Sequence, residues 1–123
     1  MSADPLDAPD DEVIRLSVPA RNEQVQVVRA AVRAVGGRAG CSDDARSRLQ
    51  AAVGAAFFEV VERAAPDANV RTEMRIEPAR ALVSLGADPP SAPLEERAFA
   101  GLADGHELSD HDRVVELWVR RDR

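Results

Sequence analysis

A long stripe of apolar residues at helical spacing, between Ser42 and Pro66, is the strongest constraint in this sequence. Ser42 can cap the start of a helix, and Asp43 and Asp44 suit the positive end of its dipole. Pro66 closes the segment because it cannot continue a helix. The stripe consists of Leu49, Ala52, Val53, Ala56, Phe57, Val60, Val61 and Ala64. A face this wide has to be buried, so we expect the helix to form one side of the core.

The composition indicates a single domain with an aliphatic core. The chain has 123 residues, of which 45% are apolar but only 3% aromatic. The net charge of −6 argues against non-specific binding of nucleic acid, because no excess positive field attracts phosphates. Every basic side chain is an arginine. The absence of lysine excludes mechanisms that need one, such as a Walker A loop.

Cysteine usage and the N-terminus bear on location and domain boundaries. The single cysteine, Cys41, cannot form an internal disulfide, which fits a reducing cytoplasm. We find no signal peptide and no apolar run of 18 residues, so we expect a cytoplasmic protein without membrane contact. Residues 1–11 are acidic and contain two prolines, and we expect a disordered tail there. Residues 12–121 would then form one domain.

The segments before the long helix predict a strand and a second helix. Residues 13–18 alternate, with Ile14, Leu16 and Val18 on one face, which is typical of a strand. A helix should follow, with Asn22 as its N-cap and Gly36-Gly37 as its stop. Its apolar positions are Val25, Val28, Val32 and Val35.

The C-terminal half predicts three strands and a short helix. Residues 70–76 and 81–86 alternate and should pair as a hairpin. Residues 94–102 have the pattern of a short amphipathic helix, and residues 104–112 that of a polar turn. Residues 114–119 form the last predicted strand.

This order, β-α-α-β-β-α-β, predicts an α+β fold of two layers. At this length the helices can cover only one face of a mostly antiparallel four-strand sheet, which makes a two-layer α/β sandwich. The other sheet face, with residues such as Arg71, Glu73, Arg75, Glu116 and Trp118, would be either solvated or an interface.

Three segments carry a resemblance to a known family. Residues 16–32 ("LSVPARNEQVQVVRAAV"), 48–68 ("RLQAAVGAAFFEVVERAAPDA") and 102–109 ("LADGHELS") resemble parts of the anti-sigma-factor serine kinases, which belong to the GHKL, or histidine-kinase-like, ATPases. The resemblance spans residues 13–120 and implies a Bergerat-like fold. In that family the long helix provides a glutamate as general base and an asparagine that holds Mg²⁺ against ATP.

The family's nucleotide-site residues are missing at the matching positions. Counted from Ala52-Val53, the general base and the Mg²⁺ ligand fall on Ala55 and Glu59. A methyl group cannot take a proton, and a carboxylate would repel the phosphates. Where the family has a glycine-rich nucleotide loop, Asp88 is followed by two prolines, which lack N–H donors. The second glycine box is replaced by "LEERAFAGL". The resemblance therefore implies a degenerate ATP site without a cofactor.

The polar residues of these segments can also be interpreted as ordinary surface residues or turn formers. Glu59 and Arg63 have the spacing of an ion pair on the solvated side of the helix. His106 and His111 lie among acids, but their spacing matches no metal motif and fits a polar turn. Arg29 lies off the apolar stripe and should be exposed. In the family an arginine there contacts partners, so Arg29 and neighbouring Arg33 are our candidate partner-binding residues.

We therefore expect a non-catalytic, anti-sigma-factor-like regulator that acts by protein–protein binding in a partner-switching system. Its implied partners are a sigma factor, an STAS-type antagonist or a related kinase-like protein, and a homodimer is possible. An active serine kinase using ATP and Mg²⁺ is one alternative. The other is a ferredoxin-like βαββαβ module for ligand sensing or oligomerisation, which results if the two helices are merged.

Overall fold

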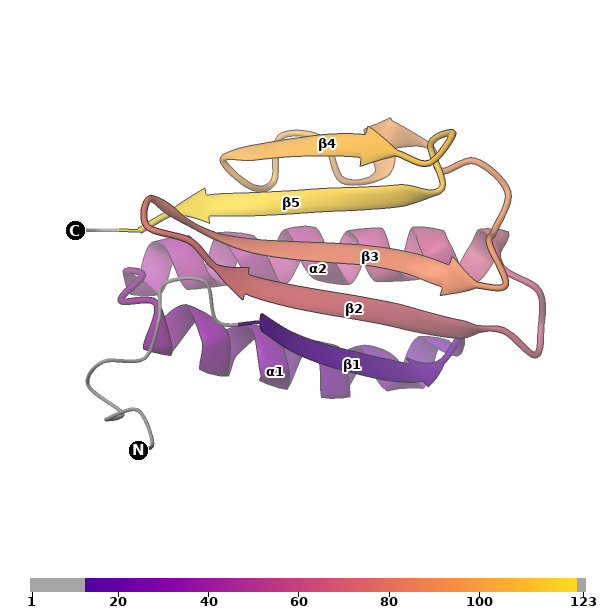
Figure 1. Ribbon diagram of the computed structural model, residues 1–123, viewed down its shortest axis with the longest axis horizontal. Coiled ribbons are helices and arrows are strands. Elements are labelled where there is room, and N and C mark those ends of the chain that lie inside the picture. The colour runs from indigo at the N-terminus through magenta and orange to yellow at the C-terminus, as the bar shows by residue number, and fades with distance from the viewer. Residues whose placement is uncertain (1–12, 122–123) are drawn as a thin grey trace, which may run out of the picture.

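A computed structural model describes residues 13–121, which form two layers (Figure 1). One layer is a five-stranded antiparallel sheet in the order β1-β2-β3-β5-β4, and the other is a pair of helices on one face of it. The strands are β1 (Val13–Pro19), β2 (Asn69–Ile76), β3 (Arg80–Asp88), β4 (Gly105–Ser109) and β5 (Val114–Arg120). The helices are α1 (Val25–Arg38) and α2 (Asp43–Arg63), and two 3-10 turns are η2 (Asn22–Gln24) and η3 (Glu96–Ala98).

This architecture confirms the predicted α+β two-layer fold, with helices on one face of an antiparallel sheet. The predicted tail, residues 1–11, lies outside the described residues. Within residues 13–121, neither helix combines the length and the apolar character that crossing a bilayer requires.

The core forms where the predicted stripes meet. Inward positions of β2 alternate with exposed or half-buried ones, and the valine stripe of α1 is buried against the sheet. α2 packs over β3 and β5, and it places Leu49, Phe57 and Val60 in the centre of the core with no exposed surface. Two predictions are thus confirmed: the long stripe is core, and that core is mainly aliphatic.

The ends of the helices differ in part from expectation. Ser42 caps α2 as predicted: its Oγ accepts a hydrogen bond from Ala45 N at 3.0 Å. Asn22 lies in η2 instead of capping α1, and α1 continues through Gly36-Gly37 to Arg38. A Cβ at Gly36 would overlap the Arg46 side chain of α2, so this glycine serves close helix packing. Gly40, with φ of 78°, follows the end of α1 and has the left-handed conformation typical of a helix terminator.

The prediction for residues 94–112 is wrong in two respects. Residues 94–102 form no α-helix but only the turn η3, and the predicted polar turn contains β4, which makes the sheet five-stranded. Leu94 and Phe99 are buried as an amphipathic pattern requires, yet they reach the core from an irregular segment that follows three prolines. The observed order is therefore β-α-α-β-β-β-β. The βαββαβ order is not formed, because within the described chain no α-helix lies between β3 and the last strands, β4 and β5.

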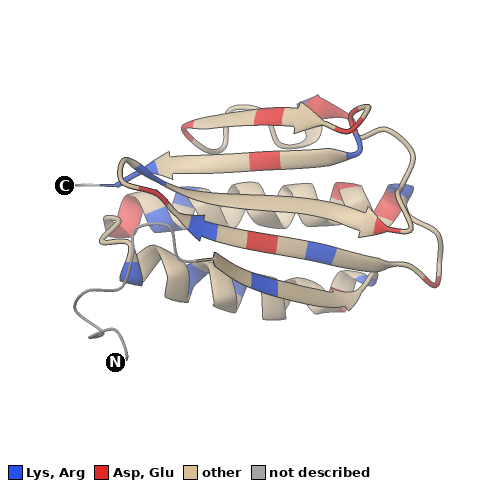
Figure 2. Cartoon of the chain, in the orientation of Figure 1, with Lys and Arg blue, Asp and Glu red and all other residues tan. Residues whose placement is uncertain are grey.

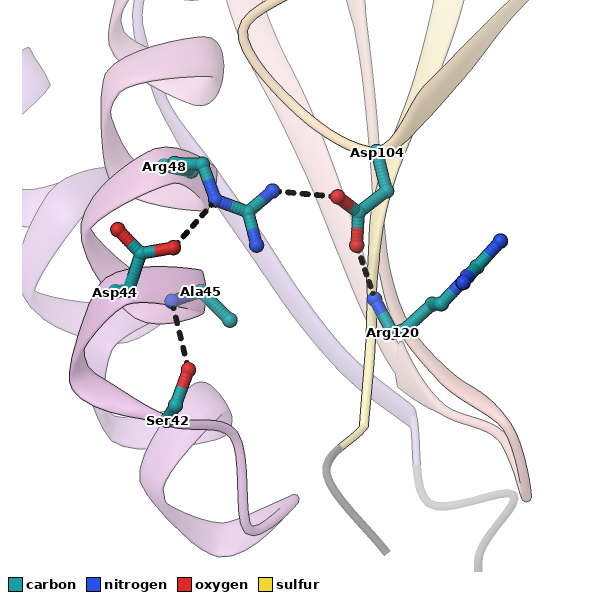
Figure 3. A network of polar contacts seen from close by, with 6 residues as sticks. All are labelled: Ser42, Asp44, Ala45, Arg48, Asp104 and Arg120. Carbon is teal, nitrogen blue, oxygen red and sulfur yellow. Dashed lines mark hydrogen bonds and ion pairs between the residues drawn. The ribbon is translucent and has the colours of Figure 1, made fainter.

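A charged network fastens the start of α2 to the sheet (Figure 3). Asp104, just before β4, accepts a hydrogen bond from Arg120 N on β5 at 2.7 Å and also binds the Arg48 guanidinium. Arg48 in turn donates to Asp44 at 2.9 Å. The Arg120 N–H, and after it the Arg48 side chain, lower the pKa of Asp104. The ionised carboxylate is therefore part of the folded structure.

We expect Asp104→Asn to lower the free energy of unfolding by about 1 kcal/mol at pH 7, because a charge-assisted contact is lost. A carboxyl with a lowered pKa stabilises the fold above its unfolded pKa of about 4, and this stabilisation disappears as the pH falls through the folded pKa. The two proteins should therefore converge in stability below about pH 4. Urea unfolding between pH 3 and 7, with exposed Asp67→Asn as control, measures this. A difference that persists unchanged at pH 3 would contradict the assignment.

Candidate functional site

The position of the family's Mg²⁺ ligand, Glu59, is buried and already hydrogen-bonded. Its side chain on α2 is only 7% exposed. Its Oε2 accepts hydrogen bonds from Arg63 Nε at 3.0 Å and from Glu95 N at 2.7 Å. The predicted Glu59–Arg63 ion pair is confirmed. The expectation that Glu59 lies on the solvated side of the helix is wrong, because the segment after β3 folds over it.

This segment, residues 89–95, is held against the end of α2 by further backbone contacts. Ala92 N donates to Arg63 O at 3.1 Å, and Leu94 N donates to Asp112 O at 2.7 Å. Two of its own residues, Ser91 and Leu94, are buried. Glu59 thus joins an irregular, proline-rich segment to a helix, and its carboxylate has a structural role that the sequence pattern did not reveal.

Of the three segments that match the family's nucleotide site, two are in contact, because Glu95 N donates to Glu59 Oε2 at 2.7 Å, whereas the Asp88 side chain lies apart from them. Ala55 and Glu59 lie on α2, on the helical side of the sheet. Asp88 occupies an outward position at the end of β3, where its carboxylate lies 3.6 Å from Arg71 Nη1. The two glutamates in place of the second glycine box have other contacts: Glu95 pairs with Arg97 at 3.3 Å, and Glu96 contacts His106.

Neither histidine lies in a cluster of candidate metal ligands within residues 13–121. His106 lies on β4, with its ring edge-to-face against Phe99 at 5.7 Å between centroids. His111 lies in the turn between β4 and β5, with positive φ like its neighbours Asp110 and Asp112. Among residues 13–121, no three His, Cys, Asp or Glu side chains are grouped as metal ligands would be.

The predicted partner residues, Arg29 and Arg33, lie on the side of α1 that faces α2. Arg29 is half-buried rather than exposed, which corrects the expectation. Its guanidinium carbon lies 6.0 Å from the centroid of the Phe58 ring. A Cβ at Gly54 would overlap the Arg29 guanidinium, so the missing side chain there makes room for the arginine. Gln50 Nε2 also donates to Arg29 O at 3.3 Å.

Together, Arg29, Arg33, Gln50 and Phe58 form a continuous strip, which we call the helix seam. Arg33 is exposed and lines a small hollow of about 280 Å³ beside Gln50 and the start of α2. Phe58 is 39% exposed, one of the largest apolar side chains at the surface of the described residues. Sequence reasoning missed Phe58, although a phenylalanine directly after the buried Phe57 must point away from the stripe.

The sequence matches no protein-family model and no curated protein.

We expect Glu59→Ala to lower the free energy of unfolding by about 2 kcal/mol, because Arg63 and the Glu95 N–H both lose their acceptor in a buried place. Glu62→Ala, an exposed neighbour on the same helix, should cost less than about 0.5 kcal/mol. Urea unfolding of both variants tests this. Equal losses for the two would show that Glu59 does not hold the segment.

Proposed function

We propose that this protein is a non-catalytic, anti-sigma-factor-like regulator that binds other proteins through the helix seam. The observation that carries this proposal is Arg29, whose guanidinium lies against Gly54 and 6.0 Å from the Phe58 ring while its side chain stays partly exposed. Arginine and aromatic side chains supply most of the strong contacts in protein interfaces. An arginine that is already ordered loses less conformational entropy on binding.

The charge of α1 supports an acidic partner surface. α1 carries Arg29, Arg33 and Arg38 and no acidic residue, whereas the whole chain has a net charge of −6. A basic helix on an acidic protein steers a partner with an acidic patch toward this helix.

The resemblance to anti-sigma-factor kinases supplies the candidate partners: a sigma factor, an STAS-type antagonist or a related kinase-like protein. A role without ATP is supported by the contacts of Glu59 and by the place of Asp88 on the other sheet face. The lone cysteine fits a cytoplasmic location for such a partner-switching system.

We expect Arg33→Glu to weaken partner binding by about tenfold and Arg29→Ala by about 10- to 100-fold, as losses of about 1–3 kcal/mol at an interface imply. Candidate partners are sigma factors and STAS-domain proteins from the same cells, titrated by calorimetry. Arg97→Ala is the control, because this side chain is 89% exposed outside the helix seam. Because Arg33 is exposed, its variant should keep wild-type stability, so lost binding would not reflect unfolding.

Titration with ATP and Mg²⁺ separates this function from an active kinase. We expect no binding heat at micromolar nucleotide. Micromolar affinity, or phosphate transfer to an STAS-domain protein, would overturn the non-catalytic proposal. Unchanged binding of a partner by both arginine variants would overturn the helix seam as its site.

A further inference from the structure

The sheet face opposite the helices is uncovered among the described residues (Figure 1). We call it the outer face and define it by the three central rows of outward positions. These are Val13, Arg75, Leu82, Trp118 and Gly105 in one row, Arg15, Glu73, Ser84, Glu116 and Glu107 in the next, and Ser17, Arg71, Gly86, Val114 and Ser109 in the third. Its centre, on β3, has small side chains at Ser84 and Gly86, and a hollow of about 670 Å³ lies over that part.

Charge is divided between the two halves of the outer face (Figure 2). The β1–β2 half carries three arginines, at 15, 71 and 75, and one glutamate, Glu73. The β4–β5 half carries Glu107 and Glu116 within these rows, and the exposed Arg120 of β5 lies in the next outward row, opposite Arg80. A face with one basic and one acidic half is complementary to itself when one copy is turned over onto another.

The acidic half lacks compensation within the chain. Glu107 and Glu116 are directly opposite each other in the β4–β5 register, an arrangement of like charges that destabilises a sheet. Within residues 13–121, neither glutamate has an ion-pair partner. On the basic half, Arg15 and Arg71 keep side chains that are 75% and 72% exposed. A cation from another molecule would therefore stabilise the two glutamates, and the exposed arginines on the basic half of a second copy carry the required positive charge.

We propose that the outer face binds a second copy of this chain, with a two-fold axis parallel to the strands over β3. In this arrangement β1 faces β4 of the second copy, β2 faces β5, and β3 faces itself. Arg15 then meets Glu107 of the second copy, and Arg75 lies over the row position of its Trp118, whose ring is already contacted by Arg80 of its own chain at 4.6 Å. Ser84 and Gly86 face their own equivalents, where small side chains let the two sheets approach.

Charge favours this axis over the other two-fold arrangement. An axis perpendicular to the strands would put Glu107 on Glu107 and Glu116 on Glu116, while Arg71 would face Arg75. Repulsion of this kind costs several kcal/mol. The proposed axis leaves like-charged approaches of Glu73 to Glu116 of the second copy, and of the outward Arg80 and Asp88 of β3 to their own equivalents. Arg80 and Asp88 have partners of opposite charge within the chain, Glu77 at 2.7 Å and Arg71 at 3.6 Å. Glu73 is already neutralised there by Arg15 at 3.0 Å and Arg75 at 3.2 Å.

The area of the outer face is sufficient for a specific dimer. Five strands spaced about 4.8 Å apart and about seven residues long cover roughly 500 Å² of plane per copy. The accessible surface buried by both copies is then about 1,000 Å², the smallest area expected of a specific interface, which fits a weak and reversible dimer. Sheets stack face to face in this way in β-sandwiches, with the strands within about 30° of each other.

Sedimentation velocity on the full chain, from about 1 μM to 1 mM, tests the proposal. We expect a reversible dimer that Ser84→Arg abolishes, because a long side chain there would fill the hollow at the centre of the outer face and hold the two sheets apart. Arg15→Glu and Glu107→Arg should each weaken the dimer by about tenfold, and the protein carrying both should recover the wild-type constant. Arg33→Glu in the helix seam is the control and should leave the dimer intact.

Three results would contradict the proposed dimer or its axis. A chain that stays monomeric at 1 mM overturns the proposal. So does a dimer that survives Ser84→Arg, since its interface would lie elsewhere. A double charge exchange that fails to restore the dimer, while circular dichroism shows that all variants are folded, overturns the assigned axis. The helix seam is on the opposite layer, so any of these results leaves the proposed partner site standing.

Discussion

Burial of the apolar face of α2 is the interaction on which the remaining structure depends. This 21-residue helix crosses β3 and β5 and also packs along α1, so it contacts every layer of the core. Glycines set the distance between the two helices: Gly54 of α2 leaves room for the Arg29 guanidinium, and Gly36 of α1 leaves room for the Arg46 side chain. An aliphatic core with few aromatics is stable only when such surfaces fit closely, because a gap in it would leave side chains without partners.

Two carboxylates fasten irregular segments to this helix, one near each end. Asp104 binds Arg48 near the start of α2, and Glu59 binds Glu95 N near its end. Both segments carry sequence features that would otherwise suggest chemistry, namely a His/Asp-rich turn and a proline loop at the place of a nucleotide site. Asp104 and Glu59 thus hold the fold, whereas Glu107, Asp110 and His111 of the His/Asp-rich segment remain exposed.

The two layers offer two surfaces of different character. The helix seam joins an ordered arginine to an exposed aromatic ring, a combination suited to a foreign partner. The outer face is flat, with small residues in the middle and opposite charges on its two halves, which suits a second copy of the same chain. Because the core separates them, both surfaces can be occupied at once. If both proposals hold, a dimer presents two helix seams, one on the outside of each copy.

The sequence by itself determined the two layers, both long helices, the strands β1, β2, β3 and β5 and most of the core, because these depend on periodic burial that each segment shows locally. It also predicted the Glu59–Arg63 pair, which depends only on helical spacing. Only the tertiary structure decided that residues 94–102 are not helical and that β4 exists, since their conformations follow from contacts with Glu59, Asp112 and β5, far away in the chain. The same holds for the partial burial of Arg29 and for the separation of Asp88 from Glu59. Whether a side chain faces solvent, a helix or the far side of a sheet is set by what packs against it, and the pattern of one segment does not contain this information.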